Sequence, residues 1–296
     1  SDPGPEAVAF MAEAKAANEA RHSRMVDLTR ELYARAGLEV DVTYASIVAL
    51  VSERAEVPAD WVVLQERHVA LGFQETLFAA LPADERPAFL ERLYGQPARA
   101  AADDVVGTQG ELRSRLMKAG GPAFVDETPV PFEEAVAFIR GAGAIVVYPT
   151  VADGADPVCG YEDPVEDLIE RMGDHDIYGA ELIPLRNTPE CLDHYVTAWR
   201  DAGIFVTAGT EHNTLDRIPV DPTCQNGVPI SERSRDIFWE GVCVVAAHQH
   251  LRQQDQAGYV DETGALNPGF PDGETRLRYF AEMGAELIYE ATRTAR

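Results

Sequence analysis

The fold is decided by the stretch YGAELIPLRNTPECLDHYVTAWRDAGIFVTAG, residues 178–209. It contains a short apolar run, a segment with apolar residues at helical spacing, and a second short apolar run. The same alternation starts earlier, with AIVVYP at residues 144–149 and the helical PVEDLIERM at residues 164–172. Strands and helices that alternate at this spacing are typical of parallel βαβ units, whose right-handed crossovers lay the strands side by side. We therefore predict three parallel strands.

The residues before this region carry a different pattern. Up to about residue 142 one amphipathic segment follows another, beginning with PEAVAFMAEAKAANEARHSRMVDLTRELYARAG, and no convincing strand interrupts them. We predict a helical region over residues 1–142, an insertion or cap, and a βα region over residues 143–296. Three strands cannot close a barrel. Either the helical region caps an open sheet, or further strands belong to sequence upstream.

The composition narrows the classes of function. Of 296 residues, 46% are hydrophobic, and 50 acidic against 25 basic residues give a formal net charge of −25. Such a surface repels phosphate backbones and anionic lipids, which counts against nucleic acid and membranes as partners and favours small molecules. Four cysteines without a CxxC pair, and the lack of a leader-like segment, predict a reduced, cytoplasmic protein. The scarcity of lysine and abundance of Ala and Gly indicate a bacterial source.

Polar residues follow the predicted strands at the ends where parallel α/β proteins place their chemistry. They are Tyr148 after the first run, Glu181 and Arg186 in and after the second, and Glu211, His212 and Asn213 after the third. Carboxylate, imidazole and amide oxygen suit a divalent ion such as Zn, Mn, Mg or Fe. Glu211, His212 and Asn213 are therefore candidate metal ligands, and Glu211 and His212 are also the candidate catalytic residues. The alternative is that these three residues only open a loop.

Three further residues are candidates for substrate binding. Arg186 could hold a phosphate or carboxylate bidentately, or could pair with an acidic helix. Glu181 alternates with apolar neighbours, and a buried carboxylate needs a metal ion or an Arg as its partner. Tyr148 could contact a ligand through its hydroxyl group or serve as a core aromatic residue.

The sequence HQH at residues 248–250 also invites a metal interpretation. It continues a helical segment that begins near Ser231, and side chains two apart on a helix point about 200° from each other. His248 and His250 then cannot bind the same ion. The β-branched run from Val242 to Val245 leaves a strand as the alternative.

The order of several short motifs resembles that of the polymerase and histidinol phosphatase (PHP) family. NEARHSRMVDLTREL and ERHVALGFQETL resemble the family's helical insertion, AGAIVVYP its GGVAVLAHP strand, YGAELIP its DGIEV strand, and GTEHN its GSDxH metal motif. The resemblance implies a metal-dependent phosphoesterase on a distorted TIM-like (β/α)7 barrel, partial or N-terminally incomplete here, with a large helical insertion. It aligns Glu211 with the motif's Asp, Asn213 with its His, and Tyr148 with the His of the AHP strand.

The family's first HxH motif has no counterpart upstream of the helical region. The site that the resemblance implies would need preceding sequence, or it is remodelled or lost. We predict a metal-dependent, phosphoesterase-like hydrolase of a small anionic metabolite. The alternatives are a non-catalytic small-anion-binding protein of PHP type that has lost the metal site, and a barrel metalloenzyme of amidohydrolase or isomerase type.

Overall fold

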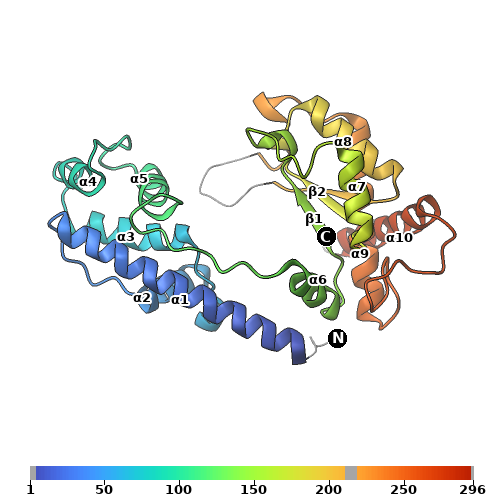
Figure 1. Cartoon of the computed structure of the whole chain (residues 1–296), viewed down its shortest axis with the longest axis horizontal. Coiled ribbons are helices and arrows are strands. Elements are labelled where there is room, and N and C mark those ends of the chain that lie inside the picture. The colour runs from blue at the N-terminus through green and yellow to red at the C-terminus, as the bar shows by residue number, and fades with distance from the viewer. Residues whose placement is uncertain (1–4, 211–218, 295–296) are drawn as a thin grey trace. The chain divides into compact units, whose positions relative to one another are not determined.

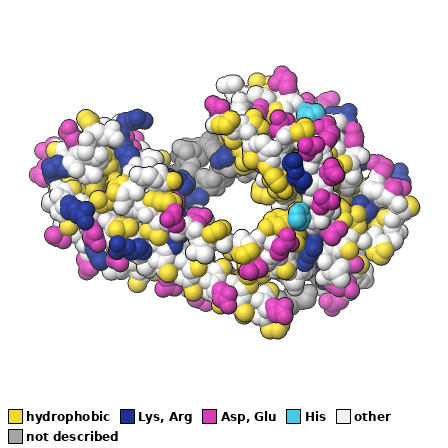
Figure 2. All heavy atoms as spheres, in the orientation of Figure 1, with side chains coloured by type: hydrophobic (Ala, Val, Ile, Leu, Met, Phe, Trp, Pro, Cys, Tyr) yellow, Lys and Arg dark blue, Asp and Glu magenta, His cyan; other side chains and the backbone are white. Residues whose placement is uncertain are grey.

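The computed structural model describes residues 5–210 and 219–294. It consists of two compact units (Figure 1). The helical unit comprises Ala9–Val130, and the sheet unit comprises Pro131–Arg296, with which Ser1–Val8 are grouped. Figure 2 shows Asp and Glu side chains scattered over the visible face of each unit, as the net charge of −25 requires. None of the described helices combines the length and the apolar composition needed to cross a lipid bilayer.

The helical unit is built around aromatic side chains from three helices. Its elements are most of α1 (Pro5–Arg35), then α2 (Tyr44–Ala55), α3 (Glu66–Ala80), α4 (Arg86–Tyr94), α5 (Val105–Leu112) and the π-helical turn η2 (Arg113–Met117). The ring of Tyr33 in α1 lies 4.9 Å from that of Phe73 in α3 and 5.2 Å from that of Phe89 in α4. The Tyr33 hydroxyl donates to the Phe73 carbonyl, so this fully buried polar group has a partner.

The sheet unit contains three short parallel strands. Its elements are α6 (Phe132–Gly141), β1 (Val147–Thr150), α7 (Val165–Asp174), β2 (Gly179–Leu182), α8 (Pro189–Asp201), β3 (Phe205–Ala208), α9 (Glu232–Gln253) and α10 (Gly273–Thr294). The strands pair in parallel in the order β1-β2-β3, which is the pairing that the βαβ spacing predicts. In register, Thr150 lies beside Leu182 and Leu182 beside Ala208, so all three strands end at one edge of the sheet.

Helices cover both faces of this sheet. Alternate strand residues point to opposite faces, so neighbouring residues of one strand pack against different helices. Val206 of β3 belongs to a buried cluster with Leu168 of α7 and Trp199 of α8. Its neighbour Phe205 belongs to a second cluster with α9 and α10 residues, including Phe280. Apolar side chains therefore pack on both faces of the sheet, which explains why the strand sequences read as short apolar runs, with Glu181 near the end of β2 as an exception.

The prediction of a (β/α)7 barrel is wrong. In the part of the chain that the structure describes, three strands form an open sheet in which β1 and β3 each pair on one side only. Barrel closure requires pairing on both sides of every strand. The described residues before Val147 form helices and turns, so they supply no strand that could close this sheet into a barrel.

The helical interpretation of HQH is confirmed, because His248 and His250 lie within α9. The His248 ring is buried between two backbone groups: one ring nitrogen lies 3.1 Å from the Gly143 carbonyl, and the other accepts from the Tyr259 N–H. Burial lowers the pKa of His248, which keeps the ring neutral and structural near pH 7.

Candidate functional site

The shared edge at which β1, β2 and β3 end is the candidate site in the sheet unit. Of the six residues predicted to contribute, the structure describes Tyr148, Glu181 and Arg186. Glu211, His212 and Asn213 lie outside the described residues.

Glu181 is held against the exit of β3. Its carboxylate is half-buried, and the Thr207 hydroxyl lies 3.4 Å from one of its oxygens. A β-carbon added to Gly209 would lie 3.1 Å from the other oxygen, so Gly209 allows the chain leaving β3 to pass close to this carboxylate. Within residues 5–210 and 219–294, Glu181 forms no ion pair.

Tyr148 and Glu181 project from opposite faces of the sheet. Register pairs Tyr148 with Ala180, on the face covered by α7 and α8, whereas Glu181 pairs with Pro149 and Thr207 on the other face. The three strands end at the same edge of the sheet, but the side chains of Tyr148 and Glu181 lie on opposite faces and do not point toward each other. Burial and the negative charge of Glu162 raise the pKa of Tyr148 to about 12, so its hydroxyl stays protonated at neutral pH.

Arg186 lies just past β2, in the 3₁₀ turn η4 (Pro184–Arg186), with an exposed side chain. Its carbonyl oxygen accepts a hydrogen bond from the side-chain amide of Gln225, which ties the loop after β2 to the segment following residue 219. The turn therefore fixes the backbone from which the guanidinium extends.

Two carboxylates that the strand-end reasoning missed organise the loops of this edge. Glu162 is 5% exposed and accepts the N–H groups of Val151 and Ala152 directly after β1, the second at 2.7 Å. Ala152 has a φ of 46°, a left-handed conformation that is costly for a residue with a β-carbon. The hydrogen bond to Glu162 helps to hold the chain in this conformation where it leaves β1.

Asp153 joins the loop after β1 to the loop after β2. Its carboxylate accepts from the Thr188 hydroxyl at 2.5 Å, from the Thr188 N–H at 3.1 Å and from the Asn187 side-chain amide at 2.8 Å. Thr188 also caps α8 by accepting the Cys191 N–H, and Thr-Pro before a helical segment is the one part of this network with a sequence signal. The other contacts join residues about 35 positions apart, which no local pattern reveals.

Replacing Asp153 with Ala is expected to lower the unfolding free energy of the sheet unit by about 2 kcal/mol, because charge-assisted hydrogen bonds are lost and Asn187 is buried. Burial alone raises the pKa of Asp153, but the bonds from Thr188 and Asn187 outweigh it and lower the pKa. The stabilisation is therefore complete at neutral pH and is lost as pH falls through that lowered pKa. Urea unfolding of wild type, Asp153→Ala and the exposed control Asp201→Ala checks this; equal losses in both variants would contradict it.

No cluster of three or more His, Cys, Asp or Glu side chains is placed to hold a metal ion within the described ranges, which leave out residues 211–218. Comparison with known proteins adds no assignment: no family model, no curated protein and no solved structure matches this chain.

Proposed function

We propose that the protein is a metal-dependent hydrolase of a small anionic metabolite, of the phosphate-ester class, with its site at the shared strand edge. The observation that carries the proposal is the half-buried Glu181 carboxylate, which has no ion-pair partner in residues 5–210 and 219–294. A partly buried carboxylate favours a cation beside it. Glu211, His212 and Asn213, with donor types that suit a divalent ion, follow Gly209 within four positions of the sequence.

The chemistry follows from this donor set. A divalent ion at such a site polarises a phosphoryl oxygen and supplies a nucleophile at neutral pH. Glu181 would hold the ion from β2, and Glu211, His212 and Asn213 would hold it from the segment after β3. Arg186 follows β2 and would bind the anionic group of the substrate through its guanidinium. Glu162 and Asp153 position the loops and need not touch the substrate.

The test is metal analysis of protein purified without chelators and supplied with Mn²⁺ or Zn²⁺. We expect stoichiometric metal in the wild type and an affinity at least about tenfold lower in Glu181→Gln and in Glu211→Ala. Glu170→Gln changes an exposed carboxylate of α7 and should leave metal binding unchanged. A metal-free wild type, or full metal content in Glu181→Gln, would sink the proposal.

A non-catalytic small-anion-binding protein is the second candidate, favoured by Tyr148. A tyrosine with a pKa of about 12 is a neutral hydrogen-bonding group rather than a metal ligand at pH 7. Metal content together with hydrolysis of a generic phosphate monoester separates the two. Turnover that is lost in Glu181→Gln supports the hydrolase, whereas anion binding without bound metal and without turnover favours the binding protein.

A further inference from the structure

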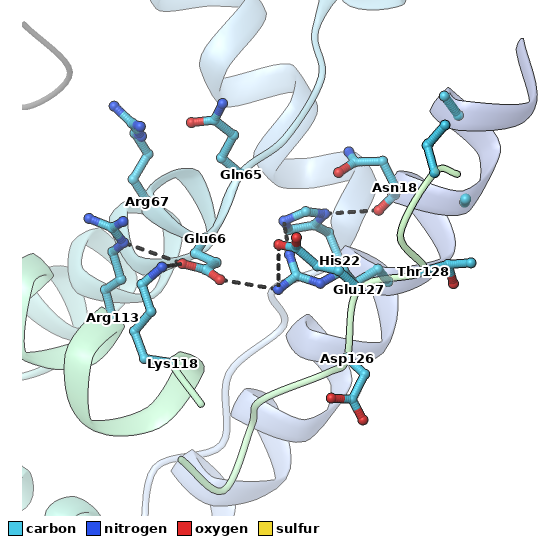
Figure 3. Close-up of a pocket in the computed structure, with 14 residues that line it drawn as sticks. Asn18, His22, Gln65, Glu66, Arg67, Arg113, Lys118, Asp126, Glu127 and Thr128 are labelled. Atoms are coloured by element: carbon cyan, nitrogen blue, oxygen red, sulfur yellow. Dashed lines mark hydrogen bonds and ion pairs between the residues drawn. The ribbon is translucent and has the colours of Figure 1, made fainter. Parts of the chain in front are cut away.

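A pocket of about 420 Å³ lies within the helical unit, far in sequence from the strand edge (Figure 3). That volume is in the range of sites for small metabolites. The pocket is formed by α1, the first turn of α3, η2 and the segment that ends at Val130. Four cationic side chains line it, Arg21, Arg67, Arg113 and Lys118, against the three carboxylates Glu66, Asp126 and Glu127. In a chain with a net charge of −25, this is a local excess of positive charge.

One carboxylate anchors three of these cations. One oxygen of Glu66 accepts from Arg21 at 3.1 Å, and the other lies 2.6 Å from the Lys118 ammonium and 3.4 Å from Nε of Arg113. The Glu66 side chain is 11% exposed. Figure 3 shows Arg113 and Lys118 approaching the Glu66 carboxylate from the same side, and Arg21 binds the other oxygen of that carboxylate. A single negative charge holds the three cations together but neutralises only one of them.

Arg21 finds a second carboxylate, because Glu127 lies 3.2 Å from its guanidinium. The surplus positive charge is therefore concentrated at Arg113 and Lys118. Arg113 contacts Glu66 through Nε, and the two terminal nitrogens of its guanidinium face away from Glu66. Arg113 and Lys118 are 35% and 49% exposed, so a ligand in the pocket can reach both.

A further feature suits a negatively charged ligand. Glu66 is the first residue of the 15-residue helix α3, so the positive end of that helix also faces this pocket. His22 positions Arg21 rather than contacting the ligand: one ring nitrogen donates to the Asn18 carbonyl at 2.8 Å, and the other lies 3.4 Å from a terminal nitrogen of the Arg21 guanidinium. Burial lowers the pKa of His22, which keeps its ring neutral near pH 7.

We propose that this pocket binds the phosphate group of a small metabolite between Arg113, Lys118 and the first turn of α3. An arginine fork and an ammonium group are the side chains that bind phosphate most effectively in proteins. The site uses residues of the helical unit only and does not depend on a metal ion at the strand edge.

The experiment is calorimetric titration of the metal-stripped 296-residue chain with inorganic phosphate. We expect Arg113→Gln and Lys118→Gln each to weaken phosphate binding by about 10- to 100-fold, since each removes a charge-assisted hydrogen bond. Arg35→Gln is the matched control. It removes the same charge from the exposed end of α1, where Arg35 pairs with Glu31, and should leave phosphate binding unchanged. Acetate is the comparison ligand and should bind more weakly than phosphate.

Two results would overturn the proposal: a wild-type protein that does not bind phosphate at millimolar concentrations, or an Arg35→Gln variant weakened as much as Arg113→Gln. Hydrogen exchange of α3 checks that each variant is folded. Glu181→Gln should retain phosphate binding here even if it loses metal, so failure of this inference is distinguishable from failure of the proposed hydrolase.

Discussion

Replacing Gly241 with Ala is expected to lower the unfolding free energy of the sheet unit by about 3 kcal/mol or more. Gly241 lies in α9 where that helix crosses β3, and an added β-carbon would overlap the carbonyl oxygen of Val206. Both partners are backbone, so no side chain can rotate away and the helix must move off the strand. Overpacking that forces a backbone shift costs about 1–3 kcal/mol of unfolding free energy and occasionally more. We expect a value at the upper end of this range because the clash at Gly241 is with backbone atoms.

Gly173→Ala is the matched control for Gly241→Ala. Gly173 lies in α7, and a β-carbon there would meet nothing within 4 Å. The substitution should be neutral or stabilising by about 0.5–1 kcal/mol, because alanine restricts the unfolded chain. Urea unfolding followed by tryptophan fluorescence reports on the sheet unit, since Trp199 is fully buried whereas Trp61 and Trp239 are exposed. Similar midpoints for the two variants would show that α9 and β3 are not in the close contact described.

The part of the fold predicted correctly is the part encoded by local pattern. Each strand of the sheet carries its own apolar run, and the helical segments between them fix the parallel connection, so the order β1-β2-β3 follows from residues 144–209. The incorrect prediction of a barrel was based instead on the order of short motifs that resemble those of a barrel family. Such an order is not evidence for additional strands where the sequence itself shows no strand pattern.

Local pattern also limits what the sequence says about the candidate site. Glu181 could be placed on one face of its strand because alternation along a strand is local, and its position beside Thr207 of β3 follows from parallel register. Glu162 and Asp153 were missed because their partners come from other loops. The cationic pocket was also missed, since Arg21, Glu66 and Arg113 lie about 45 residues apart in sequence and meet only after three helical elements pack.

Removing the Glu66 carboxylate is expected to lower the unfolding free energy of the helical unit. In Glu66→Ala, Arg21 loses a buried partner, and Arg113 and Lys118 are left to repel each other. Breaking a fully buried ion pair costs about 3–5 kcal/mol; because Arg113 and Lys118 reach solvent, we expect about 2–3 kcal/mol at pH 7. Glu31→Ala removes a carboxylate from an exposed pair with Arg35 and should cost about 0.5 kcal/mol or less. Hydrogen exchange of the peptide covering α3 measures both, with peptides from the sheet unit as an internal reference.

The stabilisation that Glu66 contributes to the helical unit is expected to depend on pH. Burial alone raises the pKa of Glu66, but the hydrogen bonds and charges of Lys118, Arg21 and Arg113 outweigh it and lower the pKa below the ordinary value of 4.5. A group with a lowered folded-state pKa stabilises the protein above its unfolded-state pKa, and that stabilisation is lost as pH falls through the folded-state value. The difference in α3 exchange between wild type and Glu66→Ala should therefore be full at pH 7 and shrink steadily below pH 4.5. If it were as large in acid as at neutral pH, the carboxylate would act through packing alone, and the charge cluster at the mouth of the helical pocket would have no energetic role.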